Sequence, residues 1–176
     1  MSSFQLIAFA TLLLTAGASA ALADDAADVA RERQMPVPVV KNVFAGVDAF
    51  YASPQAPGNR LTSGTFKQLT LKAVRDRMNS LGDAQPGSLS EASDEESTAT
   101  YHVAVRTTRH DSSETRECVE NKVQLDSTEG VPAIKDGAFI IDTDHPLVRT
   151  WGWTMTFCRT VGASGGHSAW QLATAR

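Results

Sequence analysis

The sequence predicts an α+β domain in which two N-terminal helices pack on one face of an antiparallel sheet of four to five strands. Apolar residues recur with helical spacing over 39–51 and 63–81, and they alternate with polar residues from Thr100 onward. The stretch 148–160 shows this alternation most clearly, because one face of the predicted strand carries Trp151, Trp153, Met155 and Phe157. A helical half followed by a strand half is typical of α+β domains.

The N-terminal residues have the composition of an export signal. Residues 4–18 are apolar or small almost throughout, and alanine-rich triplets suited to cleavage follow them. We therefore expect 1–23 to be a signal peptide, 24–38 a flexible leader that is mobile or weakly helical, and 39–176 a single domain. The protein is then exported, to the periplasm or the extracellular space.

Composition excludes some classes of partner. The chain has 176 residues, 42% of them hydrophobic, and a formal net charge of −4. An acidic balance gives no basic surface for a nucleic acid backbone, so we expect no nucleic acid partner. No second apolar stretch is long enough to cross a bilayer, so no transmembrane span is expected in the mature chain.

Both helices have clear sequence signals. The first, over 39–51, carries an apolar stripe, and a segment rich in Pro and Gly ends it. The second, over 63–81, begins at Ser63 as a candidate cap, and Gly82 is expected to end it in the left-handed conformation. Residues 83–99 contain several Ser and a run of acidic residues, and we expect a flexible acidic loop there.

The remaining half of the chain predicts the sheet. Turn-forming residues separate the alternating segments, including RHDSS at 109–113 and DTDHP at 142–146, and STEG at 127–130 begins a longer connection. The predicted strands are 100–108, 114–126, 138–141, 148–160 and 167–173.

Two cysteines, Cys118 and Cys158, occur in the chain. In an exported protein they most simply form one disulfide. Alternation places Cys118 on the polar face of its strand and Cys158 on the threonine face of its own. If the two strands lie in one sheet, both cysteines point away from the Trp face and a bridge between them is geometrically reasonable.

A resemblance to a known family rests on the order of these elements. The segments VDAFYASPQ (47–55) and LTSGTFKQL (61–69), and the closing TFCRTVGASGGHSAWQLA (156–173), are similar to the small exported members of the NTF2-like, cystatin-related cone fold. The resemblance covers 39–173 and implies a strongly curved sheet. Enzymatic members carry Asp with His or Arg inside the cone, and no matching set is found. A weaker similarity is to a rickettsial-type surface antigen domain with paired cysteines.

A cone-type sheet implies a pocket between the Trp face and the helices. The candidate lining is Tyr51, Tyr101, Asn121, Trp151, Trp153, Met155 and Trp170. Asn121 is the one polar residue on this face, as in many small-molecule sites, although a filled core with Asn121 near an edge would give the same pattern.

Candidate chemistry is sparse. Two groups at predicted turns could be metal ligands or simply turn formers, namely His110 with Asp111, and His145 with Asp142 and Asp144. Neither has the spacing of a typical metal site, and no nucleophile–base motif or phosphate loop is present. The sequence therefore predicts no catalytic, cofactor-binding or metal residue.

Three functional hypotheses follow. The first is an exported non-enzymatic binding or interaction domain, associated with the envelope or secretion or acting as an inhibitor or immunity-type protein. The second is a pocket protein for a small apolar ligand, and the third is an enzyme of the same fold. A cavity behind the Trp residues would favour the pocket protein, and a carboxylate or His with a shifted pKa inside it would favour the enzyme.

Overall fold

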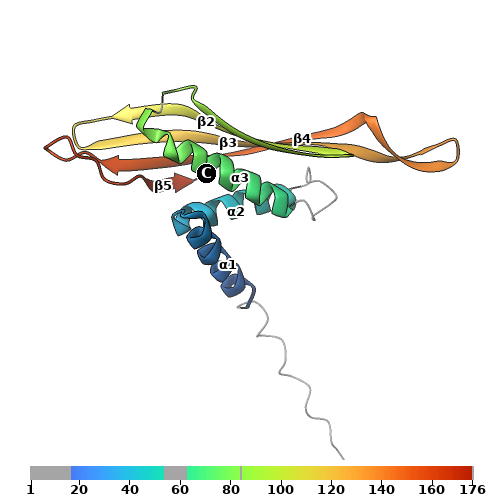
Figure 1. Ribbon diagram of the computed structural model, residues 1–176, viewed down its shortest axis with the longest axis horizontal. Helices are drawn as coiled ribbons and strands as arrows, with labels where there is room; N and C mark the ends of the chain where they lie inside the picture. Colours follow the sequence, from blue (N-terminus) through green and yellow to red (C-terminus); the bar gives the residue numbers. More distant parts are fainter. Residues whose placement is uncertain (1–16, 54–62, 84, 176) are drawn as a thin grey trace, which may run out of the picture. The chain divides into compact units, whose positions relative to one another are not determined.

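The computed structural model describes residues 17–53, 63–83 and 85–175 (Figure 1). The chain divides into two compact units, Met1–Lys41 and Asn42–Arg176. The boundary lies close to the predicted start of the domain at residue 39, but it falls within a helix instead of at the end of a leader.

In the first unit, helix α1 spans Gly17–Arg33, and α2, Val37–Ala52, begins before the unit ends. Most of the expected leader over 24–38 is helical, which is one of the two forms expected for it, and its flexibility stays a prediction. Alanine-rich segments favour helix, and this preference outweighs the polar composition. The prolines still act as expected, because Pro36 separates the helices and Pro38 lies in the first turn of α2, where no hydrogen bond is lost. The signal peptide stays a prediction: residues 1–16 lie outside the described residues, and the expected cleavage position falls within α1.

The second unit contains both predicted helices. The remainder of α2 and helix α3, Ser63–Asn79, meet through Phe50 and Phe66, whose rings pack edge to face at 5.6 Å. A short 3₁₀ helix, η2 (Leu81–Asp83), follows α3. Gly82 lies within this turn and is not among the glycines with positive φ, so its predicted left-handed role is wrong.

Five strands form one antiparallel sheet whose spatial order is the chain order: β1 (Leu89–Glu96), β2 (Ala99–Ser112), β3 (Arg116–Lys135), β4 (Ala138–Thr160) and β5 (Gln171–Ala175). Helix α3 contacts β1 and β2, as Figure 1 shows. Both helices thus lie on the Trp face, since Phe50 of α2 packs against Trp151 with ring centres 6.4 Å apart. The predicted α+β fold is confirmed.

Strand β1 corrects the prediction of a flexible acidic loop. It pairs with β2 along its whole length, and Ala92 opposite Val103 is its one buried residue. The other residues of this edge strand lie at least partly in solvent, so their polar composition resembles that of a loop.

The β3–β4 hairpin is longer than predicted. Strand β3 continues through STEG to Lys135, Asp136 and Gly137 form the turn with φ of 53° and 77°, and β4 returns without a separate short strand. The pairing slips once, where Gly130 faces residues 143–146. A side chain at Gly130 would come within 2.5 Å of Ile141 Cγ2, which explains the glycine. Residues 131–142, which we term the arm, extend beyond the other strands (Figure 1).

The centre of the sheet is a filled core. Trp153 packs against Gly46, where a Cβ atom would lie 2.5 Å from the ring, and Trp153 Nε1 donates a hydrogen bond to Asn42 Oδ1 at 3.0 Å. Cys118 and Cys158 are directly opposed in the β3–β4 register and form the predicted disulfide. Alternation places this bridge on the sheet face opposite Trp153.

Candidate functional site

The predicted pocket residues are not gathered around one cavity. Asn121 is 1% exposed and accepts a hydrogen bond from Thr107 Oγ1 at 2.8 Å, so it belongs to the core. Trp153 is likewise packed and hydrogen-bonded. Tyr51 lies at the end of α2 against Phe50 and Phe66. The middle of the Trp face therefore has the filled core that the sequence left open as an alternative.

Of the four other residues, Met155 is fully buried in the core, and three lie nearer the ends of the sheet. Tyr101 contacts Phe66 and also lines a pocket, described next. Trp151 is half-buried, and its Nε1 has no hydrogen-bond partner among the described residues. Trp170 lies at the other end, beneath the guanidinium of Arg159, which is 4.4 Å from the ring centre.

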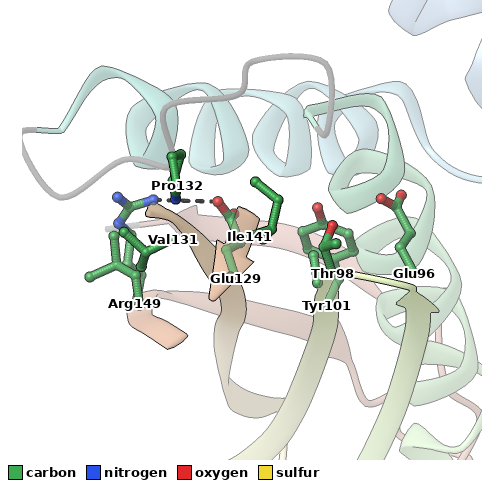
Figure 2. Close-up of a pocket in the computed structure, with 11 residues that line it drawn as sticks. Glu96, Thr98, Tyr101, Glu129, Val131, Pro132, Ile141 and Arg149 are labelled. Atoms are coloured by element: carbon green, nitrogen blue, oxygen red, sulfur yellow. Dashed lines mark ion pairs between the residues drawn. The ribbon is translucent and has the colours of Figure 1, made fainter. Parts of the chain in front are cut away.

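A pocket of about 500 Å³ opens where the β1–β2 hairpin meets the base of the arm (Figure 2). Its volume lies in the usual range for small-molecule sites. One part of its wall is apolar and the other is polar. The lining is Glu96, Thr98, Ala99, Tyr101, Glu129, Gly130, Val131, Pro132, Ile141, Leu147 and Arg149.

Glu129 and Arg149 form an ion pair inside this pocket. Arg149 Nη1 lies 3.7 Å from Glu129 Oε2, and each side chain is only 16% exposed (Figure 2). This distance is too long for a hydrogen bond. Glu129 Oε1 and Arg149 Nη1 have no hydrogen-bond partner within the described part of the chain. Buried charged groups are normally hydrogen-bonded, so this pair has unused binding capacity.

The register explains why the pair is loose. Glu129 is opposite Leu147, and Arg149 is opposite Ser127, so the two charges are diagonal neighbours. Diagonal residues on a sheet face are roughly 7–8 Å apart, against about 5 Å for directly opposed residues. The two side chains therefore approach only to 3.7 Å, close to the upper limit of about 4 Å for an ion pair.

The surroundings of Glu129 favour its neutral form. Burial raises the pKa of its carboxyl group above the ordinary value, and the negative charge of Glu96 adds to the rise. The charge of Arg149 and the nearby hydroxyl of Ser127 oppose this effect without cancelling it. The ionised form of Glu129 is therefore destabilised by its surroundings. A positively charged or hydrogen-bonding ligand would stabilise it.

The opposite end of the same face carries a second Glu–Arg pair. Glu117 and Arg159 are directly opposed, and Arg159 Nε donates a hydrogen bond to Glu117 Oε2 at 2.5 Å. His110 Nε2 lies 2.8 Å from Glu117 Oε1, and His167 Nδ1 is 3.7 Å from Oε2. Burial raises the pKa of Glu117, but the hydrogen bonds and charges of Arg159 and His110 outweigh it and leave the pKa below its ordinary value. This cluster is satisfied internally.

Sequence reasoning missed Glu129 because it assigned STEG to a loop. The signal was present: Val123, Leu125, Ser127 and Glu129 have the same parity, so extending the strand would have placed Glu129 on the core face. Arg149 lies near the start of the predicted strand 148–160, and nothing in its sequence context marks it as a site residue. No group of three or more His, Cys, Asp or Glu in the described ranges could hold a metal ion.

No family model matches this chain, and no curated protein or solved structure is significantly similar to it. Among the helices that the structure describes, none combines the length and apolarity needed to span a bilayer. The NTF2-like resemblance stays a prediction.

Proposed function

We propose that this chain is a non-enzymatic binding protein that holds a small amphipathic molecule in the pocket at the base of the arm. One observation carries the proposal: the pocket of about 500 Å³ contains a mostly buried ion pair in which one carboxyl oxygen of Glu129 and one guanidinium nitrogen of Arg149 lack hydrogen bonds. The proposal joins the binding-domain hypothesis to the pocket hypothesis, but it moves the site from the Trp residues to Glu129 and Arg149. Export remains part of the proposal, supported by the disulfide and the apolar N-terminal sequence.

The two walls of the pocket suit the two parts of such a ligand. Pro132, Ile141 and Leu147 supply an apolar surface, and Leu147 is still partly exposed. Covering apolar surface contributes about 25 cal/mol per Å². Glu129 and Arg149 supply charged groups in a partly desolvated position, where hydrogen bonds to charged groups are worth about 1.5–3 kcal/mol each. A molecule with one apolar and one polar end would use both.

An enzymatic role has one observation in its favour, the raised pKa of Glu129 inside a pocket, which is a property of many general acids and bases. A general acid needs a reacting partner group. Among the described lining residues there is no His, Cys or Lys that could serve as a base or nucleophile beside it. We therefore retain binding as the function.

The test uses anilinonaphthalene sulfonate, a fluorescent molecule with apolar rings and one anionic group. We expect saturable binding to the folded protein, with fluorescence as the measurement. Leu147→Asp should weaken binding at least about tenfold, since it puts a negative charge on the otherwise apolar wall, where the apolar rings of the probe would lie. Val148→Asp is the matched control: Val148 is the next residue along β4, is exposed, and is not a lining residue.

Circular dichroism and urea unfolding establish that both variants are folded, because this probe also binds partly folded proteins. Equal affinities for Leu147→Asp and Val148→Asp would place the bound probe elsewhere and contradict the proposed site. Absence of saturable binding by the folded protein would contradict the proposed function itself.

A further inference from the structure

The order of charges across the pocket identifies a ligand class. On the helix-facing side of the sheet, Arg149 of β4 carries the positive charge, Glu129 of β3 a negative one, and Glu96 of β1 another. Figure 2 shows Glu129 between Arg149 on one side and Glu96 on the other. The polar wall is therefore dipolar, with its positive end at β4 and its negative end at β1.

The register leaves room beside the negative end. Glu96 is opposite Ala99, and Ala99 is opposite Glu129, so the two carboxyl groups flank the small side chain of Ala99 on strand β2. Residues separated by one intervening strand are roughly 10 Å apart. Ala99 lines the pocket. A cationic group placed above Ala99 would lie between two carboxylates, and the repulsion of Glu96 that contributes to the raised pKa of Glu129 would be relieved.

We infer that the ligand is a zwitterion with an apolar side chain, of the class of free apolar α-amino acids. This inference rests on the proposed function. The ammonium group of the ligand is held by Glu129 and Glu96, its carboxylate by Arg149, and its side chain by Pro132, Ile141 and Leu147.

Two observations favour a zwitterion over a ligand with one charge. First, Glu129 Oε1 and Arg149 Nη1 both lack hydrogen bonds, and a simple amine or a simple acid would satisfy only one of them. Leaving a charged group buried without a partner carries a substantial penalty, so a singly charged ligand binds less tightly. Second, Arg149 Nη1 and Glu129 Oε2 are 3.7 Å apart, and an α-amino acid also carries its two charged groups close together, on one carbon atom.

The pocket volume fits this class. About 500 Å³ accommodates a branched or aromatic amino acid together with water, and it is open enough for the side chain to vary. The apolar wall favours leucine, isoleucine and phenylalanine over polar amino acids, because their side chains lose contact with water when they are placed on it.

The experiment is isothermal titration calorimetry of the full chain with L-leucine and two analogues that each lack one charge. Leucinamide keeps the ammonium group and lacks the carboxylate, whereas N-acetylleucine keeps the carboxylate and lacks the ammonium group. We expect L-leucine to bind with a Kd below about 1 mM and each analogue to bind at least about tenfold more weakly.

Two variants assign the charges to residues. Arg149→Gln should reduce the affinity for L-leucine to near that for leucinamide, and it should leave leucinamide binding within about twofold. Glu129→Gln should weaken L-leucine and leucinamide about equally. If Arg149→Gln still binds leucinamide, its pocket is intact. Its lowered affinity for L-leucine then cannot be explained by a folding defect. Arg106→Gln, an exposed charge outside the pocket lining, is the matched control and should change nothing.

The outcomes separate this inference from the proposed function. Binding of anilinonaphthalene sulfonate that depends on Leu147, without binding of L-leucine, would overturn the zwitterion class and leave the amphipathic pocket standing. Binding of L-leucine and leucinamide with equal affinity would overturn the role of Arg149 and point to an amine ligand. Failure of both probes would overturn both proposals.

Discussion

Each end of the sheet carries one Glu–Arg pair, and the two pairs differ in their hydrogen bonding and in the direction of the glutamate pKa shift. At one end, Glu117 is hydrogen-bonded by Arg159 and by His110, and its pKa is lowered. At the other, Glu129 faces Arg149 at 3.7 Å without a hydrogen bond, and its pKa is raised. Both glutamates are on β3 and both arginines on β4, so residue type does not explain the difference.

The difference comes from register. The first pair is directly opposed and the second is diagonal, next to the point where the ladder slips at Gly130. Both pairs lie in one unbroken register that runs from Arg116–Thr160 to Glu129–Leu147, so the positions of the residues along the strands make the second pair diagonal, and the slip begins only beyond Glu129. One regular ladder thus holds a hydrogen-bonded structural ion pair where Glu and Arg are directly opposed, and the proposed binding pair where they are diagonal. Four variants test that division.

The largest expected effect is loss of the disulfide, which lies beside the Glu117 pair. The double variant Cys118→Ser with Cys158→Ser should lower the free energy of unfolding by about 4 kcal/mol, because the bridge closes a loop with a sequence separation of 40. Urea unfolding measures it, and the reduced natural protein is the control. Probe binding at the pocket should stay within about twofold; a tenfold loss would show that the two ends are not independent.

The next effect is expected from Glu117→Gln. This change keeps the shape of the side chain but leaves Arg159, which is 16% exposed, without its opposing charge. We expect the free energy of unfolding to fall by about 2–3 kcal/mol. Glu114→Gln, in the exposed turn between β2 and β3, is the control and should stay within about 0.5 kcal/mol. A loss for Glu117→Gln no larger than that of its control would remove the structural role of the pair.

A smaller effect is expected from Trp170→Leu. The Arg159 guanidinium lies 4.4 Å from the ring centre, and such cation–π contacts are worth about 1 kcal/mol. Trp170→Phe should retain part of this stability. A double-mutant cycle with Glu117→Gln should give a coupling energy different from zero, because both side chains hold the same guanidinium. Strict additivity would place Trp170 outside the cluster.

The smallest expected effect on stability is that of Glu129→Gln, a change within about 1 kcal/mol that is neutral or stabilising near pH 7. A carboxyl group with a raised folded pKa stabilises the protein fully below its unfolded pKa, ordinarily 4.5, and this stability is lost as the pH rises through the folded value. Glu129→Gln should remove this decline from the pH profile of urea unfolding.

The pH profile of Glu117→Gln should change in the opposite sense. Its pKa is lowered, so its stabilisation is present above the unfolded value of 4.5 and is lost as the pH falls through the folded value. The Gln variant should lack this loss on the acid side. Parallel profiles for the two variants would contradict the contrast between the two ends.

Much of the fold could be predicted because its signals are local. The stripe of α2 and α3 and the Trp alternation of β4 each required only a short window of sequence. Strand β1 was missed because a single buried residue, Ala92, faces the core, and one residue makes no pattern. The arm was missed because turn-forming residues at 142–146 are accommodated as an irregularity within β4.

The candidate site was beyond sequence reasoning for a different reason. Asn121 attracted attention as a polar residue on an apolar face, but a partner on the neighbouring strand, Thr107, satisfies its side-chain oxygen. Glu129 and Arg149 become neighbours only through the β3–β4 register, which pairs residues about 20 positions apart and is not visible in composition or periodicity. The candidate site depends on pairing between residues that are distant in the sequence. The helices and strands depend mainly on local sequence preference.

The order of the strands has a consequence for how the protein is made. Each strand pairs with the one before it in the chain, so the sheet can grow one hairpin at a time as the polypeptide emerges. Contacts between successive segments form quickly, because little chain must be closed into a loop. If the hairpins form in chain order, Cys118 is fixed in the β2–β3 hairpin before β4 pairs, and the β3–β4 register then places Cys158 directly opposite it. Formation of the Cys118–Cys158 disulfide would therefore stabilise a sheet that has already formed, and it would not direct strand pairing.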